Sequence, residues 1–273
     1  MRKLCLLLLT VCFATFVNAQ VTVTNPGNTT PGLAATYASL AAAITDLNLQ
    51  TAISGPVTIT LDPANPQTTP VGGYSITATL TGASAVNTVT FEGSGNTITA
   101  FTPQTAGLLY DAIFKIIGSD FITIQNFVMQ ENAANTTTAA ASNNMTEWGV
   151  ALLYATTTNG AQNITIQNNT ISLNRTYQNT FGIYSNSTHT ATVVSTSATA
   201  TTAAGGNSNL KIYSNNISNV NNGIVIVGPT AAADMNTGVE VGGTAPTANT
   251  LTNYGTTGTF SSYANVSGTV NGI

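Results

Sequence analysis

One nine-residue pattern occurs three times and constrains the fold of this chain more than any other feature. Its copies read FITIQNFVM, NITIQNNTI and NLKIYSNNI, and they occupy residues 121–129, 163–171 and 209–217. The second, fourth and ninth places are apolar in every copy. A recurring pattern of this kind is typical of repeat proteins, in which each unit buries its apolar face against its neighbours.

The pattern predicts a strand, a corner and a second strand. Ile164 and Ile166 alternate with polar residues, which is the period of a half-buried strand. Asn168 and Asn169 interrupt the alternation, and asparagine tolerates the left-handed backbone of a tight bend. The alternation then resumes, with Ile171 pointing inward.

The sixth place of the pattern carries a small polar residue in each copy. These residues are Asn126, Asn168 and Ser214. Neighbouring strands lie about 4.8 Å apart, so we expect the three side chains to stack and their amides to bond along the stack. We interpret them as structural ladder residues.

A second recurrence lies between the copies of the first. A glycine followed by an apolar residue opens a short apolar stretch at Gly149-Val150, Gly182-Ile183, Gly223-Ile224 and Gly272-Ile273. The repeating unit therefore consists of a strand, a long loop, a second strand, a bend and a third strand, and its loops differ in length from one repeat to the next. This arrangement resembles the right-handed parallel β-helix of the pectin-lyase-like proteins. The predicted fold class is all-β, a right-handed parallel β-helix (solenoid) with a short N-terminal capping helix.

The capping helix is expected over residues 36–48. Tyr37, Leu40, Ile44 and Leu47 recur at helical spacing, and Thr36 is suited to be its N-cap. A helix here would cover the open end of the core, although a partner-binding helix is the alternative. Further strands are expected at residues 57–61, 74–80, 89–91 and 97–99, and long polar excursions at 131–147 and 185–208.

The first 19 residues have the features of a secretory signal peptide. A basic start precedes an apolar run, and Val17-Asn18-Ala19 suits cleavage after Ala19. The predicted organisation is a signal peptide (1–19), a lead-in with the cap helix (20–54) and a parallel β-helix (55–273). We therefore expect a secreted or cell-surface protein. Cleavage removes both cysteines, so the mature chain has no disulfide.

The charge balance excludes some partners. After cleavage, nine acidic residues face three basic ones, Lys115, Arg175 and Lys211. Nucleic-acid binding requires basic patches, which this composition does not supply. We also expect no membrane insertion of the mature chain, because no second apolar segment is long enough.

The resemblance to pectin-lyase-like proteins implies glycan chemistry, but the residues that carry that activity lack counterparts here. Hydrolases of this fold use clustered aspartates, and the lyases combine calcium-binding acids with an arginine base. The sequence has no Asp-Asp pair, and Arg175 lacks the Arg-x-Pro-x-x-Arg setting. We therefore predict no catalytic residues, no metal site and no cofactor.

Aromatic residues cluster in the middle of the chain and suggest a binding surface. Aromatic faces stack on sugar rings, and charged groups bond sugar hydroxyls. The predicted ligand-binding residues are Trp148, Glu147, Arg175 and Tyr177, in the company of Tyr110, Tyr154 and Tyr184. The alternative is that many of these residues anchor loops or fill the core.

The hypothesis that fits these features is a non-catalytic, adhesin-like or structural β-helix segment that contacts a glycan or cell-surface polymer. The expected helix and the sequence at residues 55–61, GPVTITL, resemble the start of large surface proteins from type IX-secreting bacteria. One alternative is a polysaccharide lyase or glycoside hydrolase whose catalytic residues lie in a missing part. Another is an ice-binding solenoid, suggested by the threonine content, although the coils look too irregular for it.

The sequence ends where a new coil would begin. Gly272-Ile273 repeats the motif that opens earlier strands. We therefore expect these residues to be the amino-terminal part of a longer protein. The alternative is a complete chain that closes its end by dimerising.

Overall fold

The computed structural model describes residues 19–139, 141–186, 199–243 and 246–255. The predicted signal peptide apart from Ala19, the Gly272-Ile273 motif and much of the excursion at 185–208 lie outside these residues. Within the described ranges the chain forms 21 strands, one α-helix and three short 3-10 helices, η1 (Pro26–Asn28), η2 (Ala203–Gly205) and η3 (Ala232–Asp234). The protein is thus mostly β-structure, as the alternating pattern predicts.

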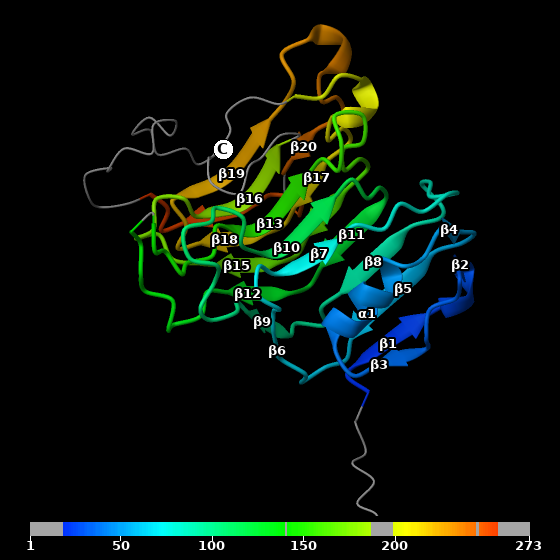
Figure 1. The fold of residues 1–273 in the computed structure, drawn as a ribbon, viewed down its shortest axis with the longest axis horizontal. Coiled ribbons are helices and arrows are strands. Elements are labelled where there is room, and N and C mark those ends of the chain that lie inside the picture. Colours follow the sequence, from blue (N-terminus) through cyan, green and yellow to red (C-terminus); the bar gives the residue numbers. More distant parts are fainter. Residues whose placement is uncertain (1–18, 140, 187–198, 244–245, 256–273) are drawn as a thin grey trace, which may run out of the picture.

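Most strands belong to three sheets (Figure 1). The first sheet contains, in spatial order, β3 (Thr36–Tyr37), β1 (Val21–Thr24), β5 (Val57–Leu61), β8 (Val89–Glu92), β11 (Ile122–Gln125), β14 (Thr165–Gln167), β17 (Lys211–Tyr213) and β20 (Glu240–Val241). The second contains β6 (Gln67–Thr68), β9 (Thr97–Thr99), β12 (Val128–Gln130), β15 (Thr170–Ser172), β18 (Asn216–Ser218) and β21 (Thr250–Thr252). The third contains β7 (Tyr74–Ile76), β10 (Ala112–Ile117), β13 (Trp148–Leu153), β16 (Phe181–Asn186) and β19 (Asn222–Val227). A separate pair joins β2 (Thr29–Thr30) to β4 (Ala52–Ile53).

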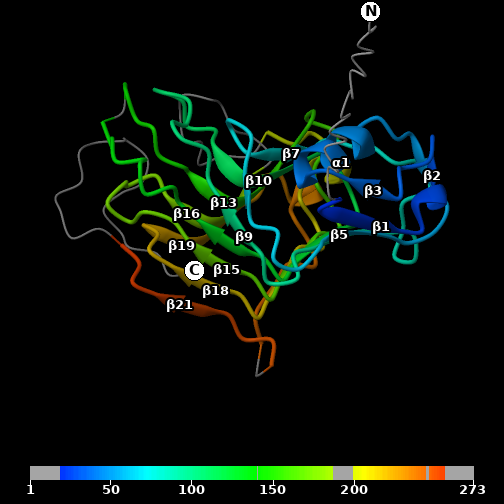
Figure 2. The same cartoon turned by 90° about the horizontal axis from the view of Figure 1, so that it is seen from below.

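Successive strands enter the three sheets in turn, and we call each set of three a rung. For example, β11, β12 and β13 form one rung, and β14, β15 and β16 form the next. From β5 onward every pairing within the three sheets is parallel, whereas β1 pairs antiparallel with β5 and β3. Figures 1 and 2 show β1, β2, β3 and α1 at one end of the stack, with β16 and β19 toward the other.

The register of the sheets places equivalent residues of the pattern above one another. Ile166 pairs with Ile124 on one side and with Ile212 on the other, and all three are fully buried. Thr165, the preceding residue, is half-exposed on the outer face. The predicted inward and outward alternation is therefore confirmed, and the interior between the sheets is a continuous apolar core.

The helix is present but shorter than the spacing predicts. The helix α1 spans Leu40–Leu47, and its N-cap is Ser39, whose Oγ accepts a hydrogen bond from the Ala42 amide at 3.2 Å. Thr36 was the expected N-cap, and this prediction is wrong because Thr36 belongs to β3 and pairs with β1. Tertiary strand pairing overrides the local helical pattern here. At the other end, the Asn48 side chain holds the helix against β7. Its Nδ2 donates to the carbonyl of Ser75 in β7, and its Oδ1 accepts from the amide of Thr77, the residue after β7.

The sixth-place residues form the corners, as predicted, but they do not form the ladder. Asn126, Asn168 and Ser214 adopt φ angles of 62°, 57° and 55°, which is the left-handed region. The stacked amides belong instead to the seventh place. The left-handed residue reverses the inward and outward alternation, so the side chain that follows it points inward. The ladder therefore lies one residue later than we expected from the sequence.

The true ladder consists of Asn96, Asn169, Asn215 and Asn249. Asn169 is an example of the hydrogen bonds in this ladder. Its side-chain Nδ2 donates to the backbone carbonyl of Ile124 at 3.0 Å, and its Oδ1 accepts from the backbone amide of Phe127 at 3.1 Å. The other three bond the backbone of the preceding rung in the same way. Each asparagine thus supplies an acceptor to a backbone amide that strand pairing leaves open at the corner, and a donor to a strand carbonyl. Phe127 occupies the equivalent place between Asn96 and Asn169 and interrupts the ladder.

The recurring glycines open the strands of the third sheet, as the sequence predicts. Gly149, Gly182 and Gly223 are each the second residue of their strand. A Cβ atom on Gly182 would lie 2.4 Å from Cγ2 of Ile217 and 2.6 Å from the carbonyl oxygen of Gly223. Glycine is therefore required here by the close approach of the next rung.

The ranges described above contain no helix with the length and apolar character that crossing a bilayer requires.

Candidate functional site

The outer face of the first sheet carries two rows of polar side chains. One row, the threonine row, contains Thr58, Thr90, Thr123 and Thr165 in consecutive register. All four are half-exposed, and their hydroxyls bond no other residue in the part of the chain that the structure describes. The row is therefore a line of uncharged hydroxyl and methyl groups at the spacing of neighbouring strands.

The second row on this face consists of Glu92, Gln125 and Gln167, and it is internally hydrogen-bonded. Nε2 of Gln125 donates to Oε2 of Glu92 at 2.8 Å, and Nε2 of Gln167 donates to Oε1 of Gln125 at 2.6 Å. This chain of bonds fixes the side chains over three strands. It leads directly to the corner where the rungs pass from the first sheet to the second.

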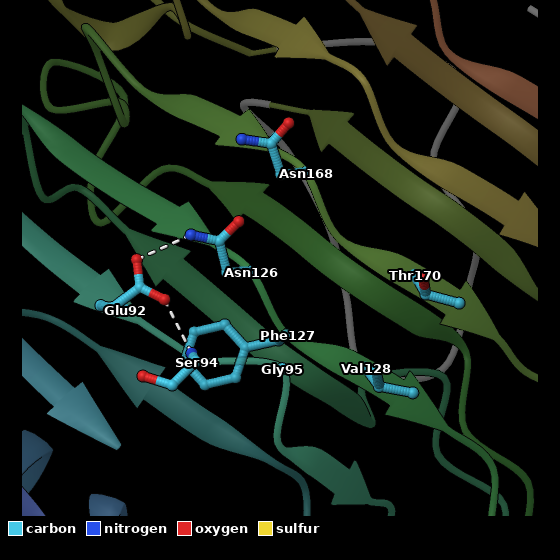
Figure 3. Close-up of a pocket in the computed structure, with 8 residues that line it drawn as sticks. All are labelled: Glu92, Ser94, Gly95, Asn126, Phe127, Val128, Asn168 and Thr170. Atoms are coloured by element: carbon cyan, nitrogen blue, oxygen red, sulfur yellow. Dashed lines mark hydrogen bonds between the residues drawn. The ribbon is translucent and has the colours of Figure 1, made fainter. Parts of the chain in front are cut away.

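A surface pocket of about 400 Å³ lies at that corner (Figure 3). It is lined by Glu92, Ser94, Gly95, Asn126, Phe127, Val128, Asn168 and Thr170. Its volume falls within the range of small-ligand sites, roughly 300–1,000 Å³. Most of the lining residues are polar, and the half-exposed Val128 adds apolar surface.

The pocket exists because one corner is longer than the next. Four residues separate Glu92 from Thr97, whereas two separate Gln125 from Val128, although both pairs of strands are in register. The extra residues include Ser94 and Gly95, which both have positive φ angles. They bulge from the rung and form one wall of the pocket, beside the shorter corner that follows.

The carboxylate of Glu92 is held in place by three donors. Oε1 accepts from the Ser94 amide at 2.7 Å, and Oε2 accepts from Nδ2 of Asn126 at 2.8 Å (Figure 3). Oε2 also accepts from Nε2 of Gln125. Other polar groups of the lining are not engaged in this way. Within the described ranges, the side-chain amide of Asn168, Oδ1 of Asn126 and the hydroxyls of Ser94 and Thr170 bond no other side chain or backbone group. A polyhydroxylated ligand would find both donors and acceptors here.

Three of the residues predicted to bind a ligand lie elsewhere, beside the third sheet. Glu147, Trp148 and Tyr177 are at most 1% exposed. The Trp148 ring is parallel to that of Tyr184 at 5.1 Å and meets Tyr110 edge-on at 5.8 Å. These contacts match the alternative, in which the aromatic residues anchor loops.

The structure brings Glu147 and Tyr177 into contact but gives Arg175 a different partner. The guanidinium of Arg175 donates to Oδ1 of Asn253 in an exposed contact. Tyr154 is half-buried. A glycan contact at the predicted residues stays a prediction, and it would require the covering loops to move.

Glu147 is the point where three loops meet. Its Oε2 accepts from the Asp111 amide at 2.8 Å, and its Oε1 accepts from the Tyr177 hydroxyl at 3.0 Å and from Nδ2 of Asn143 at 3.3 Å. These partners belong to the segments that precede β10, β13 and β16. The three loops cover a second apolar cluster, which includes Trp148.

The charges in this loop cluster are strongly perturbed. Burial raises the pKa of Asp111 to about 6 and raises the pKa of Glu147 well above its usual value. Burial also lowers the pKa of Lys115 to about 8, against the attraction of both carboxyls. The Lys115 ammonium lies 4.1 Å from the centre of the Tyr110 ring and donates to the Tyr110 carbonyl at 3.1 Å. Among the described residues, no three His, Cys, Asp or Glu side chains are grouped so that they could hold a metal ion.

Comparisons with known proteins assign no family to the chain, since no family model, no curated protein and no solved structure matches it.

The sequence identifies Asn126 and Asn168 only as corner residues, and it places Glu92 only between the strands expected at 89–91 and 97–99. The available signal was the length of the stretch Glu92 to Asn96, which exceeds that of the corners in the repeated pattern. The pocket itself depends on how two corners of unequal length stack, and this is set by the register of separate rungs.

Proposed function

We propose that this chain is a segment of a non-catalytic, adhesin-like or structural protein, secreted or at the cell surface, that contacts glycans. In this proposal the three parallel sheets are the walls of a right-handed parallel β-helix. The regular entry of successive strands into the three sheets supports it. The GPVTITL stretch, which resembles the start of type IX-secreted surface proteins, supports the proposed location.

The observation that carries the functional proposal is the corner pocket beside two rows of polar side chains. Asn168, Ser94 and Thr170 offer hydrogen-bonding side chains to a ligand, and the half-exposed Val128 adds apolar surface. Sugar rings present hydroxyls at their edges and C–H groups on their faces, so both kinds of lining are used. The rows continue the contact surface over neighbouring rungs, which suits an extended polymer.

Three acids, Glu92, Asp111 and Glu147, have structural hydrogen-bond partners, which supports a binding role over a catalytic one. Glycoside hydrolysis uses two carboxyl groups, one on either side of the scissile bond. Among the described residues that line the pocket, only Glu92 has a carboxyl group, and three donors hold it in place. Glu147 and Asp111 are buried under loops that they fasten together.

The proposal is tested with purified residues 20–273 on a glycan array, together with an assay for released reducing or unsaturated sugars. We expect binding without release. Asn168→Gly removes the pocket amide but suits the left-handed backbone, so it should weaken binding at least severalfold. The control, Thr252→Ala on the exposed surface of β21, should not.

Sugar release would replace the binding role by an enzymatic one. Absence of binding to any glycan would remove the proposal, and equal affinity of Asn168→Gly and the wild type would remove the pocket as its site.

A further inference from the structure

We infer that the corner pocket accepts an uncharged sugar residue and rejects uronates. This inference rests on the proposed glycan-binding function and names the chemistry of the ligand. It follows from the charge and the hydrogen-bonding groups of the pocket.

The fixed charge at the pocket is negative. The Glu92 carboxylate forms part of the lining, and its position is set by Ser94, Asn126 and Gln125. A uronate carboxylate in the same pocket would face a like charge that cannot turn away. Like charges at such short range disfavour binding, and more strongly so where water is partly excluded.

The cations of the described chain are not placed to offset this charge. None of the three, Lys115, Arg175 and Lys211, lines the pocket. Lys115 is buried against Tyr110, and Arg175 bonds Asn253. Lys211 lies three strands away from Glu92 along the first sheet, where its neighbour in register is Glu240.

The open hydrogen-bonding groups match an uncharged ring. The side-chain amide of Asn168 offers donors and an acceptor, and the hydroxyls of Ser94 and Thr170 can donate or accept. Sugar hydroxyls also donate and accept, so each finds a complement. A carboxylate would require donors alone, preferably a guanidinium, and Nδ2 of Asn126 is already committed to Glu92.

The test compares binding of uncharged glycans (xylan, mannan, chito-oligosaccharides) with binding of polyuronates (polygalacturonate, alginate) at low salt. The wild type should prefer an uncharged glycan by about tenfold or more, which is the size expected for one unfavourable charge pair. Glu92→Gln should raise uronate affinity and narrow this ratio. It should leave affinity for the uncharged glycan within about threefold.

The matched control is Glu240→Gln. It removes the same charge from an exposed residue of the same sheet, at β20. The ratio of its affinity for uncharged glycans to its affinity for uronates should equal that of the wild type. If Glu92→Gln does not fold, Thr170→Lys places a cation at the pocket from a half-exposed strand position and should also raise uronate affinity.

Each outcome separates the two proposals. Uronates bound as tightly as uncharged glycans by the wild type would overturn the inference but leave the glycan-binding function standing. Equal effects of Glu92→Gln and Glu240→Gln would also overturn it, because net charge rather than the pocket would then decide. Absence of binding to every glycan would instead defeat the proposed function itself.

Discussion

Buried asparagine amides complete the backbone hydrogen bonding at the corners of this protein. Strand pairing stops where the chain turns, and it leaves buried or half-buried backbone amides there without a strand partner. An asparagine side chain has a donor and an acceptor in fixed geometry, so one residue serves one group of each kind on the preceding rung. This explains why the ladder is asparagine and why it lies on the inner side of the corner.

Replacing a ladder residue should therefore cost more than replacing its neighbour. Asn169→Ala leaves the Phe127 amide without its partner and removes a donor from the Ile124 carbonyl, which should lower the free energy of unfolding by about 1–3 kcal/mol. Asn168→Gly should change it by less than about 1 kcal/mol, because glycine adopts the same left-handed backbone. Urea denaturation measures both. Equal losses would show that the ladder does not carry this energy.

These two adjacent asparagines also mark the limit of prediction from sequence. Periodicity predicts correctly that Ile166 is buried and Thr165 faces outward. It places the ladder one residue early, at Asn168, because the reversal caused by a left-handed residue is not visible in a pattern of residue types. Thr36 illustrates a different limit, since its strand pairing to β1 depends on a segment that is distant in sequence. The pocket was not predictable for the same reason.

The strands of the third sheet approach the next rung so closely at one point that only a hydrogen fits. Gly149 and Gly182 both face an isoleucine of the following rung, Ile171 and Ile217 respectively. A side chain there would separate adjacent rungs, and the separation would extend to the neighbouring corners. The glycine and the isoleucine therefore form one packing unit that spans two elements.

Gly182→Ala tests this packing unit. The added methyl group would lie 2.4 Å from Ile217 and 2.6 Å from backbone, so it should destabilise the protein by about 1–3 kcal/mol. Gly27→Ala is the control, because a Cβ there meets nothing within 4 Å. Thermal unfolding followed by circular dichroism compares the two variants. A Tm for Gly182→Ala equal to that of Gly27→Ala would contradict the close approach.

At the scale of the whole molecule, the buried carboxyls under the loops should make stability depend on pH. A carboxyl group whose pKa is higher in the folded state than in the unfolded chain binds its proton more tightly when folded. Its contribution to stability is therefore complete below the unfolded pKa and is lost as the pH rises through the folded pKa. Asp111, Glu131 and Glu147 are all shifted in this direction by burial.

We expect the free energy of unfolding to fall between pH 4 and pH 7. Asp111 has a pKa of about 6 against a usual 3.8, so this residue alone contributes a few kcal/mol to the fall, on the order of 1.4 kcal/mol per unit of pKa shift. Asp111→Asn should flatten the dependence, whereas Glu240→Gln, at an exposed residue, should leave its slope unchanged. Denaturant titrations at several pH values measure it. A wild-type stability that rises over this interval would contradict the expectation.

The convergence of three loops on Glu147 has a mechanical consequence. A pull along the stack loads the hydrogen bonds between rungs in series, so the molecule yields at the rung that is held most weakly. The segments before β10, β13 and β16 are fastened to one buried carboxyl group through Asp111, Asn143 and Tyr177. We therefore expect these three rungs, which are joined outside the sheets, to bear tension together, and rungs beyond them to separate first.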